Sequence, residues 1–515
     1  MPDKYVLLIN PPMSLGDEKN NEIVDEDFSG DLPALGILAL ASAIEDIEGI
    51  KPVYLDGNVC SFKTILSFIE NFNNNILCIG ISALSENYYI GLKILKFSRS
   101  LNNKIIHVIG NEHFTALPHL CLENQQHLLD YGFYGNDVVY KFKKFIYNLL
   151  CNQDVRNTPS LVYYHNNKLF RNPEVKESLP YEINYRLLDS YYPHTKIYER
   201  NFDSARLERW FNRKFNRSTI IEIARGCVKF KNNNKCSFCS IQYGNIWKNS
   251  ISNGKEAWSF IEKTFRNGYD VIFITADELL LTFYSLLIDM RNNMPDWFKA
   301  LSEFEKPLLI AYVRVEGLCN ERNVKLLYDL GVRIVYLGID AGSKFSINIF
   351  NKSLYKKEKG VERLYEQNKR ALDVVKKLNM KVDIGYVLGH IGLTKGILQE
   401  NIDFACELIS NYSNTIGVFD ANILCPEPGS RDYYFLINPV IAMEFAKKHQ
   451  LEIADYITCN FISEKWERQD ITLSDALIND YIEAYMPDLS INDILTGQKK
   501  IHEYAKTKHV DTDYE

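Results

Sequence analysis

The architecture is best read from the run Ile221-Glu-Ile-Ala-Arg-Gly-Cys227-Val-Lys-Phe-Lys-Asn-Asn-Asn-Lys-Cys236-Ser-Phe-Cys239, which directly follows a β-branched segment. Its three cysteines fall within thirteen residues. Cysteine thiolates are the preferred ligands of iron–sulfur clusters, and three of them leave one iron of a four-iron cluster open to a small molecule. The run therefore predicts a metal-binding loop after a strand, with Cys227, Cys236 and Cys239 as ligands.

Two alternatives stay open for these cysteines. A Cys-x2-Cys pair with one further cysteine is also a common start of a zinc site, although no fourth Cys or His lies nearby in the sequence. The second alternative is a set of buried structural thiols.

Further residues of the same run carry a family resemblance. With Arg225-Gly226 before the first cysteine and Phe238 before the last, the run resembles the cluster loop of radical SAM enzymes. The resemblance implies a [4Fe-4S] cluster that binds S-adenosylmethionine (SAM) at its open iron and cleaves it reductively.

The first gap of the loop departs from the family. Eight residues separate Cys227 from Cys236, where the family usually has three. Loop-closure entropy grows by only about 0.6 kcal/mol for each doubling of length. We therefore expect the extra Lys and Asn residues to bulge into solvent without preventing cluster binding.

The composition is that of an ordinary globular chain. Its 515 residues are 46% apolar and 24% charged, enough for two or three domains. The net charge of −7 provides no basic field for a phosphate backbone, so no nucleic-acid partner is expected. Eleven cysteines, an odd number, predict reduced thiols.

The N-terminal apolar run is too short for a signal segment, and the apolar stretch at residues 32–44 is shorter than the roughly 20 residues that a bilayer needs. We expect a cytoplasmic protein with no membrane partner.

The first 150 residues alternate short apolar strands with helical segments. Strands are predicted at residues 5–9, 52–55, 76–81 and 105–109, with helices at 33–45 and 88–100. This alternation favours an α/β fold with a doubly wound, Rossmann-like parallel sheet. In such a sheet, ligands bind beyond the carboxyl ends of the strands.

The predicted strand ends resemble a cobalamin (B12)-binding domain, whose pattern is D-x-H-x-x-G, then S-x-L, then G-G. The matching positions are Asp56, Asn58, Ser82, Leu84 and Gly110. The resemblance implies that these residues bind cobalamin.

Two positions depart from the pattern. Asn58 replaces the histidine, so imidazole cannot fill the lower axial position of cobalt. Asn111 replaces the second glycine, and its Cβ is expected to crowd a nucleotide tail. A Rossmann-like domain that serves only packing or substrate docking is the alternative.

Strand and helix patterns resume between residues 219 and 433. Six strands are predicted at residues 219–223, 271–275, 308–313, 334–339, 382–388 and 415–423, with helical segments between them. The pattern favours a partial (β/α)6 barrel, in which chemistry gathers where the strands end. The cysteine run follows the first of these strands.

The later strand ends also look like the radical SAM core. Gly338-Ile-Asp340-Ala-Gly342-Ser343 is similar to the family's G-I-E-S-G-S. The resemblance implies that SAM is contacted by Phe238, Asp277, Glu278, Arg314, Asp340, Ser343 and Val387. No residue is assigned a catalytic role.

Plainer structural roles stay open for several of these side chains. Asp277 and Glu278 also fit a solvated strand end, and Arg314 also fits a structural partner of a carboxylate. Phe238 also fits the core. The role of His390 is open.

The chain is expected to comprise a B12-binding-like domain (1–150), a connector (151–215), a radical SAM partial barrel (216–435) and a small helical C-terminal cap (436–515). The resemblance implies a cobalamin-dependent C-methyltransferase that acts on a natural-product or peptide substrate and takes electrons from a flavodoxin or ferredoxin. Two alternatives remain. One is a cobalamin-independent radical SAM enzyme for rearrangement, cyclisation or sulfur insertion. The other is an iron–sulfur or zinc protein that binds a partner through residues 436–515.

Overall fold

The computed structural model describes residues 3–15, 30–175, 182–232, 234–242, 248–249, 251–355 and 358–512. The chain divides into two compact units. Unit 1 comprises Met1–Asp203, Ser240–Ile246 and Arg468–Leu473, and unit 2 comprises Ser204–Cys239, Trp247–Glu467 and Ser474–Glu515. This division groups the predicted connector, up to Asp203, with the N-terminal domain.

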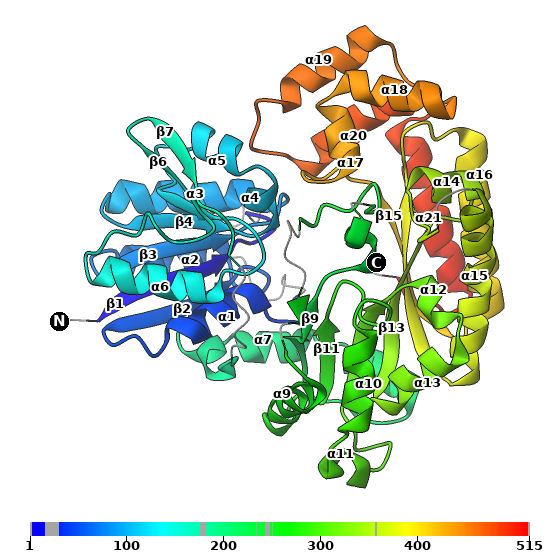
Figure 1. The fold of residues 1–515 in the computed structure, drawn as a ribbon, viewed down its shortest axis with the longest axis horizontal. Coiled ribbons are helices and arrows are strands. Elements are labelled where there is room, and N and C mark those ends of the chain that lie inside the picture. The colour runs from blue at the N-terminus through cyan, green and yellow to red at the C-terminus, as the bar shows by residue number, and fades with distance from the viewer. Residues whose placement is uncertain are drawn as a thin grey trace. The chain divides into compact units, whose positions relative to one another are not determined.

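Unit 1 contains a seven-stranded sheet in the order β2-β1-β3-β4-β5-β6-β7 (Figure 1). Its strands are β1 (Lys4–Asn10), β2 (Ile50–Asp56), β3 (Ile76–Ser82), β4 (Ile106–Gly110), β5 (Tyr131–Phe133), β6 (Leu161–His165) and β7 (Lys168–Arg171). Strands β1 to β5 pair in parallel, and β6 and β7 add an antiparallel edge. The order reverses after β1, which is the mark of a doubly wound sheet.

Alternate residues of β1 enter two separate cores, one on each face of this sheet. Leu7 and Ile9 pack in one cluster, and Val6 and Leu8 pack in the other. A strand buried on both faces needs a continuous apolar run, which explains the sequence of β1. The helices of unit 1 are α1 (Leu35–Ile44), α2 (Phe62–Phe72), α3 (Tyr88–Leu101), α4 (Glu112–Ala116), α5 (Pro118–Asn124), α6 (Val139–Leu150), the 3-10 turn η2 (Tyr185–Asp189) and α7 (His194–Asn201).

Unit 2 contains a fully parallel six-stranded sheet in the order β15-β14-β13-β12-β11-β8. Its strands are β8 (Ser218–Glu222), β11 (Val271–Thr275), β12 (Leu308–Val313), β13 (Val332–Asp340), β14 (Lys381–Leu388) and β15 (Ile416–Ile423). The strands lie in the sheet in the same order as in the sequence, so each strand is next to the one that follows it in the chain. This arrangement confirms the predicted partial barrel.

Helices follow the strands of unit 2, and Figure 1 shows α10, α13, α15 and α16 along the outside of the sheet. The helices of this part are α8 (Ser204–Phe211), α9 (Gly254–Arg266), α10 (Tyr284–Asn292), α11 (Asp296–Ala300), α12 (Val315–Leu318), α13 (Glu321–Asp329), α14 (Lys344–Ile349), α15 (Glu358–Lys377) and α16 (Lys395–Tyr412). None of the described helices is long and apolar enough to cross a membrane.

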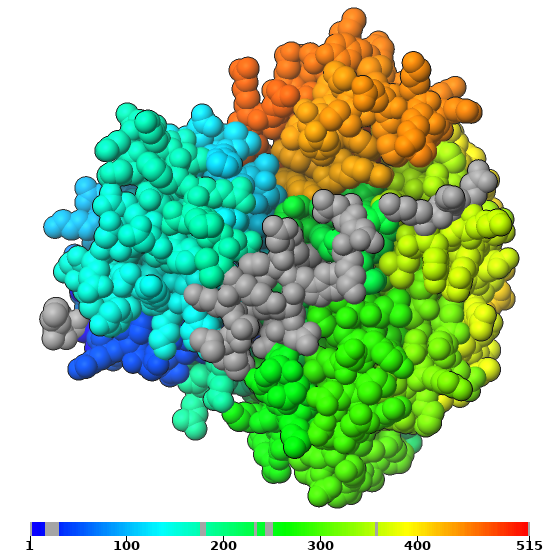
Figure 2. Space-filling model, in the orientation of Figure 1, coloured from blue at the N-terminus to red at the C-terminus, as the bar shows by residue number. Residues whose placement is uncertain are grey.

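The C-terminal region is helical, as expected. It contains α17 (Arg431–Leu436), α18 (Pro439–His449), α19 (Tyr456–Trp466), α20 (Ser474–Tyr485) and α21 (Ile491–Thr507). In the space-filling view, the orange side chains of this region form one continuous surface (Figure 2). The last helix returns to the barrel, because Gln498 of α21 donates a 2.7 Å hydrogen bond to the carbonyl of Ala421 on β15.

Candidate functional site

The cysteine loop begins where β8 ends. After β9 (Ala224–Arg225), the chain turns at Gly226, whose φ of 138° is favourable only for glycine. The Gly226 amide donates a 2.9 Å hydrogen bond to Oδ2 of Asp277, which follows β11. A glycine turn held by the neighbouring strand end therefore positions Cys227 at the carboxyl end of the sheet.

The other two cysteines lie in a turn that is fixed from both sides. The Cys239 amide donates to the Cys236 carbonyl at 3.3 Å. The intervening Ser237 donates its amide to the Phe350 carbonyl, and its own carbonyl accepts the Arg431 amide, both at 2.9 Å. Two backbone segments of unit 2 thus hold the second half of the loop.

The thiols of Cys227 and Cys236 lie close enough to interact, but the three thiols are not gathered around one point. Cys236 interacts electrostatically with Cys227, whose pKa is raised to about 11 by burial and lowered in part by the nearby Arg314. Among the residues that the structure describes, no three His, Cys, Asp or Glu side chains could hold a metal ion together. In a four-iron cluster, different thiolates bind different irons, so the donor set of three thiols still suits that group. The assignment of these cysteines as ligands stays a prediction.

Lys229, in the first part of the lengthened gap, does not extend into solvent as expected. Its first part forms the 3-10 turn η3 (Val228–Asn232), and the Lys229 side chain is buried. Lys229 Nζ donates to the carbonyls of Asn351 and Ser353, the latter at 2.8 Å, and burial lowers the lysine's pKa to about 8. Asn351 also donates to Asn234 Oδ1 at 2.8 Å. Hydrogen bonds to unit 2 thus anchor this insertion; Asn233 lies outside the described residues.

Glu278 is fully buried, which rules out a solvated strand end for this residue. Its carboxylate accepts the amides of Leu281 at 2.8 Å and Thr282 at 2.7 Å, and also the Thr282 hydroxyl at 2.6 Å. The Thr282 Oγ1 in turn accepts the amide of Val228 at 2.9 Å. Glu278 therefore acts through Thr282 on the residue directly after Cys227.

Asp277, the neighbour of Glu278, is half-buried. Burial raises the pKa of its carboxyl group, while the hydrogen bond from Gly226 acts in the opposite direction. Asp277 directly, and Glu278 through Thr282, thus hold backbone of the cysteine loop.

Arg314 has a carboxylate partner, the plainer of its two predicted roles. Its Nε and Nη2 bind the two oxygens of Glu316 at 3.1 and 2.8 Å, and Nη2 also donates to the Lys352 carbonyl at 2.6 Å. Both side chains of the pair are buried. Burial raises the pKa of the Glu316 carboxyl, but Arg314, a backbone amide and Lys352 together lower it more, so the carboxylate stays ionised. Arg314 also interacts electrostatically with Cys227 and Cys236.

Sequence analysis missed Lys352, a buried lysine beside the cysteine loop. It forms an ion pair with Asp340, and its Nζ lies 5.9 Å from the ring centroid of Phe238. Burial lowers the lysine's pKa, but Asp340 and Cys236 together raise it more, so the side chain stays charged. Asp340 has a φ of 61°, which is unusual for a residue other than glycine. Lys352 lies beyond α14 and outside every predicted strand end, so no motif marked it.

Ser343 caps helix α14. Its Oγ accepts the Ser346 amide at 3.0 Å and donates to the Ser346 Oγ at 2.8 Å. Asn401 Nδ2 also donates to Ser346 Oγ at 2.9 Å, so the Ser346 hydroxyl is left to donate to His390 Nε2 at 2.8 Å. Burial lowers the pKa of His390 to about 4, which fits a neutral acceptor. Ser343 and His390 thus belong to a structural network.

Phe238 and Val387 are both half-buried. The Phe238 ring packs edge-on against Phe350 with ring centroids 5.2 Å apart. Val387 lies two residues after Gly385 and therefore on the same face of β14. A Cβ placed on Gly385 would meet no atom within 4 Å, so this face of the strand adjoins open space.

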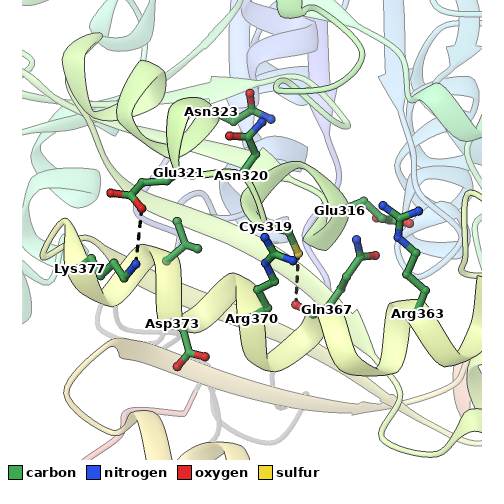
Figure 3. A pocket seen from close by; sticks show the side chains of 11 residues that line it. Glu316, Cys319, Asn320, Glu321, Asn323, Arg363, Gln367, Arg370, Asp373 and Lys377 are labelled. Atoms are coloured by element: carbon green, nitrogen blue, oxygen red, sulfur yellow. Dashed lines mark hydrogen bonds and ion pairs between the residues drawn. The ribbon is translucent and has the colours of Figure 1, made fainter.

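A pocket of about 560 Å³ is lined in part by Glu316, the partner of Arg314 (Figure 3). It is lined by Glu316, Cys319, Asn320, Glu321, Asn323, Arg363, Gln367, Arg370, Asp373, Val374 and Lys377. Most of the lining is polar; Glu321 and Lys377 form an ion pair at 3.5 Å, drawn as a dashed line. Glu316 therefore connects this pocket to Arg314 and the cysteine loop.

In unit 1, Asp56 is fully buried and its carboxylate is occupied by protein donors. Oδ1 accepts from Asn10 Nδ2 at 2.8 Å and from the Asn58 amide at 3.0 Å. Oδ2 accepts from the Ala34 amide at 3.0 Å and from the Tyr198 hydroxyl at 2.6 Å. Asp56 thus holds the end of β2 in place.

Four of the other predicted cobalamin residues lie at the same carboxyl edge. Ser82 pairs with Gly110 in the sheet, and Leu84 is 38% exposed. The Asn58 side chain is half-buried and makes no hydrogen bond within the part of the chain that the structure describes. A Cβ on Gly110 would approach only the Phe133 carbonyl, at an ordinary 3.5 Å. These residues leave the edge available to a ligand.

Asn111 occupies the position of the second glycine and keeps a glycine conformation. Its φ of 82° and ψ of −173° lie in a region that is almost exclusive to glycine. The side chain caps α4 by accepting the Glu112 amide at 2.9 Å. The asparagine therefore has a backbone conformation that suits glycine, at the cost of local strain.

Near this edge, unit 1 binds the segment Arg468–Leu473, a contact that sequence analysis missed. Asp470 accepts the Tyr88 hydroxyl at 2.7 Å and Asn124 Nδ2 at 3.0 Å. His113 Nε2 donates to the Asp470 carbonyl at 2.8 Å. Burial lowers the pKa of His113 to about 4, so its ring is neutral.

Comparison with known proteins begins with unit 1. The family model of the B12 binding domain matches residues 22–139. An uncharacterized methyltransferase, PH0819 from Pyrococcus horikoshii, is 22% identical over 481 residues, which cover 90% of each chain.

Two solved structures share the fold of most of the chain. One is the radical SAM methyltransferase TsrM from Kitasatospora setae with cobalamin and a [4Fe-4S] cluster bound. It matches with a TM-score of 0.60 and 15% identity, and the match covers 87% of this chain and 78% of TsrM. The other is the cobalamin-dependent radical SAM enzyme OxsB with aqua-cobalamin and SAM bound, with a TM-score of 0.62, 16% identity, and coverage of 90% and 66%.

The class of the fold follows from these findings. The chain carries a B12-binding domain and has the fold of cobalamin-dependent radical SAM enzymes. The resemblance inferred from the cysteine run and the strand ends is thereby confirmed for the fold.

Proposed function

We propose that this chain is a cobalamin-dependent radical SAM methyltransferase that cleaves SAM reductively and methylates an unactivated carbon of a natural-product or peptide substrate. One observation carries the proposal: a B12-binding domain and a three-cysteine loop at the carboxyl end of a six-stranded parallel sheet occur in one chain. The fold shared with TsrM and OxsB and the similarity to PH0819 support it.

In this proposal, the cluster, SAM and cobalamin supply the radical and the methyl group, and the protein positions them. At the cluster, the role of the protein is to hold the cysteine loop in one conformation. Asp277 holds the residue before Cys227, and Thr282 holds the residue after it. Hydrogen bonds on both sides of the first ligand limit its movement and favour one arrangement of the thiols.

We assign SAM to the space beside Gly385, with Phe238 and Val387 as its side-chain contacts. Both side chains are half-buried, and no atom within 4 Å would meet a Cβ on Gly385. An aromatic ring between two cluster ligands suits the adenine of a nucleoside bound at the open iron. Glu278, Arg314, Asp340 and Ser343 are bound to protein partners and act by positioning.

We assign cobalamin to the edge formed by Asn58, Ser82, Leu84 and Gly110. The position of these residues at the carboxyl ends of parallel strands is where doubly wound sheets bind ligands. His113 is neutral and donates to the Asp470 carbonyl, so Nε2 carries a proton and is not a cobalt ligand. The proposal therefore includes a cobalamin without a histidine below the metal.

The reaction also needs an electron donor, for which we propose an acidic flavodoxin or ferredoxin. The polar pocket in Figure 3 supports a docking point, because Arg363 and Arg370 line it and Glu316 links it to Arg314. We place this chemistry in the cytoplasm, since no disulfide joins the cysteines in the described part of the chain.

Anaerobic purification followed by measurement of iron, sulfide and corrinoid tests the proposal. We expect one four-iron cluster and one corrinoid per chain, and formation of 5′-deoxyadenosine when reductant and SAM are added. A cluster and deoxyadenosine without corrinoid binding would favour a cobalamin-independent radical SAM enzyme. Iron without deoxyadenosine, or zinc alone, would favour a protein that binds a partner and has no radical activity.

A further inference from the structure

Three buried cations interact with the middle cysteine of the loop. Lys229, Arg314 and Lys352 are 3%, 5% and 8% exposed. Each interacts electrostatically with Cys236. Buried cations are rare, because removal of a charge from water costs free energy unless an opposite charge compensates it.

Two of these cations have a bound carboxylate and the third does not. Arg314 is paired with Glu316, and Lys352 is paired with Asp340. Lys229 donates to the carbonyls of Asn351 and Ser353 and makes no ion pair among the described residues. Lys229 thus brings a buried ammonium group to the cysteine loop with no carboxylate bound directly to it.

A four-iron cluster held by three thiolates fits this surrounding. Thiolate ligands make the site anionic, and each electron added makes it more so. The potential of such a cluster depends on the charges and hydrogen bonds around it and on its exposure to solvent. A cation in a water-poor site acts more strongly than one at the surface, because the local dielectric constant is low.

We propose that Lys229, the second residue of the first gap, raises the reduction potential of the cluster bound by Cys227, Cys236 and Cys239. This inference rests on the proposed function. Lys229 belongs to the eight residues that separate Cys227 from Cys236, and its two carbonyl partners hold the ammonium group inside unit 2. The reduction is a transfer of one electron from a low-potential donor to the cluster; no bond forms or breaks.

Substitution of Lys229 separates its charge from its hydrogen bonds. Lys229→Met removes both, Lys229→Gln keeps a donor without the charge, and Lys229→Arg keeps the charge. Lys381→Gln is the matched control, because Lys381 also donates to a backbone carbonyl, that of Asn414 at 2.8 Å, but lies at the start of β14.

The readout is the midpoint potential of the anaerobically reconstituted cluster, followed by electron paramagnetic resonance during a redox titration with dithionite. In Lys229→Met and Lys229→Gln, we expect the ratio of reduced to oxidised cluster at a given potential to fall about tenfold, which corresponds to about 59 mV for a one-electron couple. Lys229→Arg and Lys381→Gln should retain the potential of the parent protein.

Each outcome decides the inference. Potentials within error of the parent in both uncharged variants, at full iron content, would overturn it. An equal shift in the Arg variant would also overturn it, because distortion of the loop would then be the cause. If the Met variant fails to retain iron, the Gln variant gives the decision. A parent protein that binds no four-iron cluster would instead refute the proposed function.

Discussion

The Gly226 amide donates a hydrogen bond of 2.9 Å to the Asp277 carboxylate, so the strand end of β11 holds the residue that precedes the first cysteine. Asp277→Ala removes the acceptor, whereas Asp277→Asn keeps one. A hydrogen bond to a charged group contributes about 1.5–3 kcal/mol. We expect the Ala variant to retain less iron after anaerobic reconstitution and the Asn variant to stay close to the parent. Equal iron contents in all three proteins would contradict this role.

The second prediction concerns the three cysteines themselves. Replacement of Cys227, Cys236 and Cys239 by alanine should abolish the iron bound after anaerobic reconstitution, because no thiolate ligand remains in the loop. Cys319→Ala is the control, since Cys319 is also a buried thiol of unit 2 but lines the pocket of Figure 3. Iron content and the ultraviolet–visible spectrum report the result. An unchanged four-iron content in the triple variant would refute the ligand assignment.

The third prediction tests the strain at Asn111. Asn111→Gly removes the Cβ from a backbone with φ 82° and loses only a cap that glycine partly replaces. We expect the free energy of unfolding of unit 1 to rise by about 1 kcal/mol. Asn111→Ala keeps the Cβ and loses the cap, so it should lower that energy by about 1 kcal/mol. Urea denaturation of the full chain measures both, and the opposite order of the two variants would show that the conformation is not strained.

The fourth prediction concerns the lower face of cobalt. Because Asn58 replaces the histidine and His113 donates to Asp470, we expect no nitrogen superhyperfine splitting in the electron paramagnetic resonance spectrum of the bound cob(II)alamin. Asn58→His should introduce that splitting. Ser82→Trp should lower corrinoid uptake and leave the iron content unchanged. Splitting in the parent protein would show that a nitrogen, from another histidine or from the benzimidazole of the cofactor, binds the metal.

The fifth prediction concerns pH. Burial lowers the pKa of His113 to about 4, below the 6.5 of an unfolded histidine. The unfolded chain therefore binds more protons between these values, and stability falls as pH decreases from 6.5 towards 4. His107 and His390 have the same direction and similar values. Thermal unfolding across this range should show the loss. His113→Asn should reduce the slope by at most about 1.4 kcal/mol per pH unit; an unchanged slope would contradict the assignment.

The strands could be predicted because each is a continuous apolar run. The run of β13 was expected at residues 334–339 and spans Val332–Asp340, and the run of β14 was expected at 382–388 and spans Lys381–Leu388. A parallel strand buried on both faces requires such a sequence, so local composition is sufficient. The order of the strands then follows from short connections between neighbours.

The partners of the site residues could not be predicted, because they come from distant parts of the chain. Lys352 lies in no motif, yet it pairs with Asp340 beside Phe238. Lys229 was expected in solvent, since its neighbours are polar, but carbonyls from residues 351 and 353 receive it. Glu278 and Arg314 were expected to face SAM, and protein groups occupy their polar atoms. Sequence identifies the residue types of a site, whereas the fold decides which of them are already bound.

The contact between His113 and Asp470 has a consequence for biosynthesis. The first compact unit includes Arg468–Leu473, so a ribosome must translate almost the whole chain before the Tyr88 hydroxyl and the His113 ring receive their partners. A fragment that stops at Asp203 would leave these buried groups without them, and such vacancies cost about 1–3 kcal/mol each. We therefore expect unit 1 to complete its folding only after residues 468–473 have been translated. A fragment of residues 1–203 should need these six residues added as a peptide.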